Sequence, residues 1–230
     1  MIEPIERKDT LSDQAYEQLR AALMAGVFKP GESLSIRRLA SLLEISVTPA
    51  RDAISRVLWE GGLDAGPNRT VLVPELTLEK LREIYAVRLN LEGTAAALSI
   101  RNLDDKVLAE LTKLYESHKS AVASGEYSAA LKANEAFHFG IYKLSKNSLL
   151  IEIIRSLWLK LGPSLNLLYP AYFNNLKGVS NHSRVMDALK EFDPIATRSA
   201  IEADLYDGQD ELARALSKHE ENSSTTLGAK

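Results

Sequence analysis

Four polar side chains in the second half of the sequence have the donor atoms and the spacing of a metal site. Asn134 and His138 stand four residues apart in "LKANEAFHFGIY", so on a helix they share one face. His182 follows near the start of a later helical stretch, and Asp204 lies in the last long one. Nitrogen and oxygen donors from three helices can converge on a divalent ion inside a bundle. The alternative is that both histidines bond their neighbours and line a pocket without an ion.

A second group of residues could hold a small organic acid as an effector. Arg88 can pair with a carboxylate, although a salt bridge to Glu92, one helical turn further on, is a simpler alternative. Trp158 and Tyr169 can wall the effector cavity, although aromatic residues at helical spacing are more often plain core. We expect His118 to face solvent and assign it no role.

The stretch "SIRRLASLLEISVTPARDAISRVLWEGG", residues 35–62, indicates a different chemistry. It contains two short amphipathic helices with a tight polar break between them. Thr48 suits the N-cap of the second helix and Pro49 its first position. An exposed, polar helix start offers free amides and a positive dipole end, which suits the major groove of DNA.

The expected DNA contacts lie at the start of this second helix, on the helix before it and on a wing after it. Thr48 can bond a phosphate, while Arg37 and Arg51 can bond guanine or phosphate. The alternative is a helical hairpin whose surface arginines only keep it soluble. The full predicted set is Arg37, Ser46, Val47, Thr48, Arg51, Asn68 and Arg69.

The elements around this stretch have the order of a winged helix. A helix over 11–26 ends at a glycine and is followed by the turn "KPGESL". After the two helices, "LDAGPNRTVLVPEL" has the turn residues and the alternating β-branched residues of a small hairpin. We therefore predict an N-terminal winged helix-turn-helix domain over 1–75, with the boundary near Pro74.

Beyond that boundary the periodicity is helical and no strand pattern appears. The predicted fold class is therefore mostly α, a winged helix-turn-helix followed by an all-α antiparallel helical bundle. We assign 76–222 to effector binding and dimerisation, and 223–230 to a disordered tail. The predicted helices cover 77–100, 104–124, 127–145, 148–169, 181–191 and 194–218.

The composition of the 230 residues excludes several classes of protein. There is no cysteine, which excludes a disulfide framework, a thiolate zinc site and a cysteine nucleophile. The most apolar region, "LLIEIIRSLWLKLGPSLNLLY", is interrupted by charges and a proline, so we expect a soluble cytoplasmic protein without a membrane span. The formal net charge of −3 gives no argument for nucleic acid, so DNA binding must depend on a local patch.

The N-terminal region resembles the signature of GntR-type transcription regulators. The resemblance covers "LRAALMAGVFKPGESLSIRRLASLLEISVTPARDAISRVLWEGGL" with the family's spacings. It implies DNA contacts by Arg37, Val47, Thr48, Arg51 and a wing near 66–69. The family usually has arginine where this chain has Val47, which can only touch a thymine methyl or pack on sugar. The usual Arg-Gly tip of the wing is also absent.

The second half resembles the FCD effector domain of the FadR subfamily. The pieces that carry the resemblance include "VRLNLEGTAAALS", "NEAFHFGIY" and "NHSRVMDAL". In that family an aspartate and three histidines commonly bind a divalent metal, and a carboxylate effector completes the coordination. The resemblance places these ligands at Asn134, His138, His182 and Asp204. Two of the four are changed, but the set keeps one formal negative charge and remains compatible with zinc or a similar ion.

These observations predict a ligand-responsive DNA-binding repressor that is not an enzyme. We expect a homodimer on double-stranded DNA with a palindromic operator, and a small organic acid in the helical domain. The first alternative is a metal-dependent enzyme that acts on small carboxylates, although no evident general base or nucleophile motif accompanies the metal ligands. The second alternative is a dimerisation module without a ligand.

Overall fold

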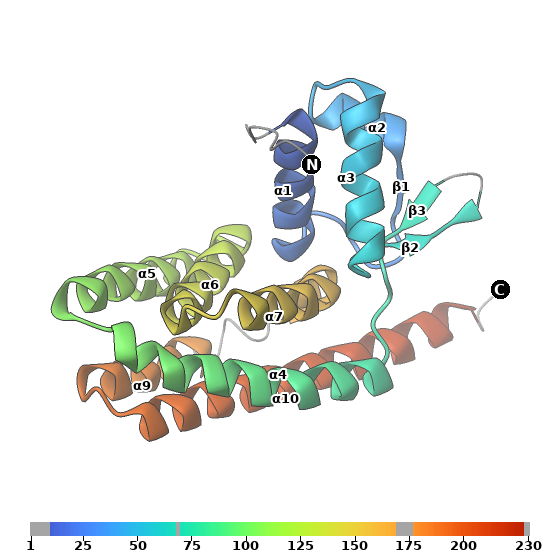
Figure 1. Cartoon of the computed structure of the whole chain (residues 1–230). Coiled ribbons are helices and arrows are strands. Elements are labelled where there is room, and N and C mark those ends of the chain that lie inside the picture. Colours follow the sequence, from blue (N-terminus) through green and yellow to red (C-terminus); the bar gives the residue numbers. More distant parts are fainter. Residues whose placement is uncertain (1–9, 68–69, 169–176, 228–230) are drawn as a thin grey trace, which may run out of the picture.

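The N-terminal part of the chain forms a winged helix, as predicted (Figure 1). In this computed structural model, residues 10–67, 70–168 and 177–227 are described, and their side chains up to residue 219. The three short strands pair antiparallel in the order β1-β3-β2, and the hairpin of β2 and β3 is the wing. The elements are α1 (Leu11–Met24), β1 (Ser33–Ser35), α2 (Ile36–Leu42), α3 (Val47–Trp59), β2 (Asp64–Ala65) and β3 (Thr70–Leu72).

Capping residues set where these helices begin. Thr10 and Asp13 form a reciprocal capping box at the start of α1, and the Ser35 hydroxyl accepts a hydrogen bond from the Arg38 amide in the first turn of α2. The N-cap of α3 is Ser46, so the predicted start at Thr48 was wrong by two residues. Proline is still tolerated inside the first turn, because the amide hydrogen that it lacks would have no partner there.

The remainder is an all-α domain, which confirms the predicted fold class. The long helices α4 and α10 lie side by side along one edge; α6, α7 and α9 pack on them, and α5 packs on α6 and α9 (Figure 1). The helices are α4 (Leu78–Ser99), α5 (Asp105–Ala123), α6 (Tyr127–Tyr142), α7 (Ser148–Leu161), α9 (Lys177–Lys190) and α10 (Pro194–Leu227). Short 3-10 segments follow α4, α6 and α7, and they are η2 (Ile100–Asn102), η3 (Lys143–Ser145) and η4 (Gly162–Leu168).

Three predicted boundaries differ from the structure. The stretch predicted as one helix over 148–169 changes to a 3-10 segment at Gly162, just before a proline that cannot donate to an α-helical ladder. The segment between the predicted helices over 148–169 and 181–191 already contains helix from Lys177 onward. Helix α10 continues beyond 218 to Leu227, into the segment expected to be a tail.

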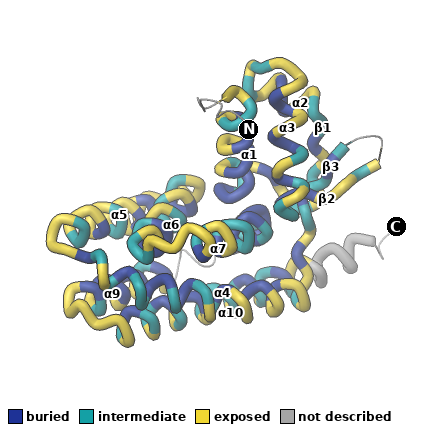
Figure 2. The backbone as a smooth tube through the Cα atoms, in the orientation of Figure 1, coloured by how far each residue is buried: buried dark blue, intermediate teal, exposed yellow. Residues whose placement is uncertain are grey.

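The DNA-binding and helical domains pack directly against each other through α1, α7 and η4. Gly162 fits against the backbone of α1, where an added Cβ would lie 2.6 Å from the Cα of Met24. Lys160 donates to the Gly61 carbonyl at 3.5 Å, and Asn166 donates to the Gly26 carbonyl. Buried residues run along both domains (Figure 2), and most of the hydrophobic ones belong to one connected cluster. No helix in the described part of the chain is long and apolar enough to cross a membrane.

Candidate metal centre and DNA-binding surface

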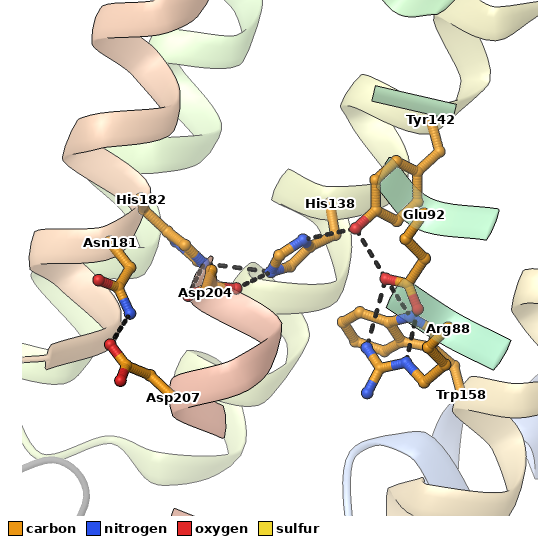
Figure 3. A network of polar contacts seen from close by, with 9 residues as sticks. All are labelled: Arg88, Glu92, His138, Tyr142, Trp158, Asn181, His182, Asp204 and Asp207. Carbon is orange, nitrogen blue, oxygen red and sulfur yellow. Dashed lines mark hydrogen bonds and ion pairs between the residues drawn. The ribbon is translucent and has the colours of Figure 1, made fainter. Parts of the chain in front are cut away.

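Three of the four predicted metal ligands meet in the middle of the helical domain. His138 on α6, His182 on α9 and Asp204 on α10 are all buried (Figure 3). The two histidine Nε2 atoms lie 3.2 Å apart, and Asp204 Oδ2 lies 3.2 Å from Nε2 of His138. Asp204 Oδ1 lies 4.0 Å from Nε2 of His182.

These separations fit a divalent metal ion. Ligand atoms about 2.0–2.1 Å from a tetrahedral zinc ion are about 3.3 Å apart, which is close to the two 3.2 Å contacts. Two imidazole nitrogens and one carboxylate oxygen are a common zinc donor set, and three protein ligands leave a position for an exogenous ligand. The donor set and its geometry therefore fit the ion that the sequence predicted.

The protonation states of these groups also suit a metal. Burial holds the pKa of His182 well below its ordinary value. Burial alone would raise the pKa of Asp204, but the close contact with His138 and the neighbouring histidines keep it below the ordinary value. A neutral imidazole and an ionised carboxylate are the forms that bind metal ions.

Asn134, the fourth predicted ligand, is not in this cluster of three. It lines the same cavity as His138 and Asp204, where it is half-buried on α6. Arg88 and Trp158, two of the predicted effector contacts, also line this cavity. The third, Tyr169, lies outside the described residues. The structure therefore brings the predicted metal and effector residues to one cavity, with Asn134 in its wall.

Arg88 is buried and engaged by Glu92, as the alternative anticipated. Its Nε and Nη2 atoms donate to the two Glu92 oxygens at 2.5 and 3.3 Å. Glu92 is fully buried and accepts two further bonds, from Tyr142 Oη at 2.7 Å and from Trp158 Nε1 at 3.1 Å. Tyr142 in turn contacts Nδ1 of His138 at 3.0 Å (Figure 3). Sequence reasoning missed Tyr142 entirely and gave Glu92 no part in the site.

The expectation that His118 faces solvent was wrong. Its side chain on α5 is only 3% exposed, lines the cavity and lies with its ring centroid 4.5 Å from that of His182. Burial lowers its pKa to about 4, so the ring is neutral near pH 7. Its Nδ1 has no hydrogen-bond partner among the residues that the structure describes. The signal was available, because residues 111, 118 and 122 share the apolar face of α5.

The predicted DNA-contacting residues at the start of α3 lie on the surface. Ser46, Val47, Thr48 and Arg51 are all exposed, as is Arg37 on α2. This end of α3 points away from the helical domain (Figure 1). The wing residues Asn68 and Arg69 lie outside the described part of the chain.

The arginines of this surface differ in whether an acidic residue pairs with them. Arg38 pairs with Glu32 at 2.7 Å, and Arg56 pairs with Asp13 at 2.8 Å. By contrast, neither Arg37 nor Arg51 forms an ion pair within the described ranges, so both can meet a phosphate or a base.

A winged helix with an exposed recognition helix, joined to a helical domain with a polar cavity, defines a ligand-sensing transcription regulator. Comparison with known families agrees: residues 11–73 match the model of bacterial regulatory proteins of the gntR family, and residues 83–207 match the FCD domain. The chain belongs to the GntR family of transcriptional regulators and carries an FCD domain.

Individual relatives support this assignment. The chain is 33% identical to the HTH-type transcriptional regulator McbR of Escherichia coli K12 over 84% of this chain and 88% of McbR. The solved McbR structure superposes with a TM-score of 0.85 at 32% identity, covering 89% of this chain and 98% of McbR. The gluconate operon transcriptional repressor of Bacillus subtilis is 24% identical over 86% of this chain and 83% of its own length.

Proposed function

We propose that this regulator is a repressor whose DNA affinity responds to a small organic acid bound beside a divalent metal ion. The observation that carries the proposal is the convergence of His138, His182 and Asp204 at a cavity of the FCD domain. An ion held by three protein ligands keeps an open position that a carboxylate can fill. A repressing role is supported by the gluconate operon repressor among the relatives.

The proposed effector site uses the cavity walls around the ion. Asn134 is a neutral polar group in that wall, suited to a hydrogen bond with the effector rather than to zinc coordination. Arg88 and Trp158 line the same space while they bond Glu92, so they contribute a positive and an aromatic wall. We retain Tyr169 as a predicted contact.

The proposed DNA interface is the exposed end of α3 with Arg37 and the wing residues Asn68 and Arg69. Val47 in place of the family's arginine removes one phosphate or base contact, so the operator will differ from those of arginine-bearing relatives. A homodimer would place two recognition helices on the half-sites of a palindromic operator. The proposal assigns DNA binding to 1–75, effector binding and dimerisation to 76–222 and a tail to 223–230, in a protein of the cytoplasm without enzymatic activity.

One experiment tests the DNA half of this proposal. Selection from random duplex oligonucleotides should enrich an inverted repeat. Arg51→Ala should then weaken binding to it by about 5- to 150-fold, which corresponds to about 1–3 kcal/mol. Arg101→Ala, an exposed arginine of the helical domain, is the matched control and should bind like the parent. No enriched repeat, or equal effects of the two changes, would reject the assignment.

A second experiment tests the sensing half. Elemental analysis of the purified protein, or titration with zinc after chelation, should find about one ion per chain. His138→Ala combined with His182→Ala should abolish this binding while the protein still binds the selected operator. A thermal-shift series of dicarboxylates and sugar acids should stabilise the zinc-loaded parent and not the double variant. Zinc retention by the double variant would exclude the proposed site.

A further inference from the structure

We infer that Glu92 and Tyr142 act as positioning residues that fix the tautomer of His138, so that its Nε2 is left bare toward His182 and Asp204. This inference rests on the proposed metal site, whose ligand it prepares. The chain of contacts runs from Arg88 through Glu92 and Tyr142 to His138 (Figure 3). Three of these residues come from outside the predicted ligand set.

Glu92 sets the direction of the hydrogen bonds in this chain, because it is the acceptor in each hydrogen bond that it makes with the described residues. Two guanidinium nitrogens of Arg88, the indole nitrogen of Trp158 and the hydroxyl of Tyr142 all point at its two oxygens. The guanidinium and the indole have hydrogens to donate and cannot accept. Both oxygens of Glu92 receive hydrogens from these donors, so Glu92 is the acceptor in its contact with Tyr142.

The direction of the next bond follows from counting hydrogens. A tyrosine hydroxyl has one hydrogen, and the Glu92 oxygen 2.7 Å away accepts it. The Tyr142 oxygen therefore faces Nδ1 of His138, 3.0 Å away, with lone pairs alone. Nδ1 must then carry the hydrogen of this contact, and in a neutral imidazole the other nitrogen, Nε2, is bare.

The bare Nε2 is the atom that faces the ligand cluster. It lies 3.2 Å from Nε2 of His182 and 3.2 Å from Oδ2 of Asp204. A lone pair facing a carboxylate oxygen at that distance costs free energy in the metal-free protein, and the bond from Tyr142 to Glu92 has to outweigh that cost. A divalent ion satisfies all three atoms at once. Hydrogen bonding to the second ring nitrogen is also how proteins orient metal-binding histidines.

His182 provides an internal contrast. Its Nδ1 is buried and has no hydrogen-bond partner among the described residues, so nothing seen there fixes its tautomer. The relay is therefore specific to His138, and a change at Tyr142 should act directly on that histidine.

The test begins with the metal-free parent protein and nitrogen-15 NMR of its imidazoles. The spectra are recorded at about pH 8.5, two units above the ordinary histidine pKa, where the tautomers of neutral rings can be distinguished. We expect His138 to carry its hydrogen on Nδ1. Tyr142→Phe should move it toward Nε2, where it faces Asp204 and His182. A parent protein with the His138 hydrogen on Nε2 overturns the inference.

Zinc affinity, measured by competition with a chelating dye, is the second readout. Tyr142→Phe should weaken zinc binding by about 10- to 100-fold, the usual effect of removing such a partner. The matched control is Tyr115→Phe, which removes a hydroxyl from a tyrosine that packs near Phe137 in the same domain. Equal effects of the two variants overturn the inference.

Two further outcomes keep the inference separate from the proposed function. Glu92→Gln replaces an acceptor by an amide that can donate to Tyr142, which turns the hydroxyl toward Nδ1 and moves the His138 hydrogen to Nε2. If this variant folds, its zinc affinity should fall at least as far as that of Tyr142→Phe, and unchanged affinity overturns the inference. If the parent protein binds no zinc but shows the Nδ1 hydrogen, lost in Tyr142→Phe, the relay is supported and the proposed metal site fails.

Discussion

The buried pair of Arg88 and Glu92 should be the most sensitive point of the FCD domain. Arg88 is 4% exposed and Glu92 fully buried, so both charges are largely removed from solvent. Arg88→Met keeps much of the aliphatic stem but removes the positive charge and two of the four hydrogen bonds to Glu92. Removing one partner of a buried ion pair costs about 3–5 kcal/mol, because the other charge stays buried and uncompensated.

The double variant Arg88→Met with Glu92→Met separates this cost from simple loss of packing. It removes both charges and leaves only the hydrogens of Tyr142 and Trp158 to find new acceptors, at about 1–3 kcal/mol. Tyr142 can then donate to Nδ1 of His138, 3.0 Å away. The double variant should therefore be more stable than Arg88→Met alone.

A fluorescence melt can measure this difference in one domain. The chain has two tryptophans, and Trp59 is 91% exposed at the end of α3, so Trp59→Phe costs little and leaves Trp158 as the reporter. A loss of 3–5 kcal/mol should lower the melting midpoint by about 6–20 °C. A decrease of less than about 2 °C, or a double variant that melts below the single one, would refute the assignment of Arg88 to Glu92.

Two other predictions follow from the packing and from the histidines. Gly162→Ala should cost about 1–3 kcal/mol, because its Cβ would meet the backbone of Met24 at 2.6 Å; Gly208→Ala, whose Cβ would find only an ordinary 3.5 Å contact, should melt no lower than the parent. As the pH falls from 6.5 toward 4, the free energy of unfolding of the metal-free protein should decrease by up to about 3 kcal/mol. The reason is that His118 binds a proton in the unfolded state, whereas the buried ring of the folded state, with a pKa of about 4, stays neutral. Urea titrations should show this loss reduced in His118→Phe, and a flat profile in the parent would contradict it.

Local patterns were sufficient to predict the fold class and the exposed end of α3. The six long helical stretches follow from apolar periodicity, and the exposed face of residues 46–51 follows from polar residues at a helix start. The small errors also have local causes. Serine and threonine are both good caps, so Ser46 and Thr48 compete for one role and the sequence does not decide between them.

The relay could not be predicted because its members meet only in the folded bundle. Glu92 and Tyr142 are 50 residues apart, and Glu92 and Trp158 are 66 apart. Nothing in the spacing of these residues distinguishes such contacts from solvent exposure or plain core. Three of the four residues that the family resemblance implied as ligands do lie together, but their further hydrogen-bond partners depend on this chain's own packing. His118 shows the same limit, since its burial depends on how α5 packs against α9.

Helix α6 borders both the effector cavity and a groove beside α1 of the DNA-binding domain. One face of α6 carries Asn134 and His138 to the cavity. Another face, with Glu135, borders a groove whose opposite wall includes the buried Arg20 of α1. A ligand changes DNA affinity only if it binds one arrangement of the two domains better than another. Because α6 is a single helix about 10 Å wide, we expect a rotation that moves His138 to move Glu135 relative to Arg20 as well. Such a coupled movement would link the cavity to the arrangement of the two domains without a moving loop.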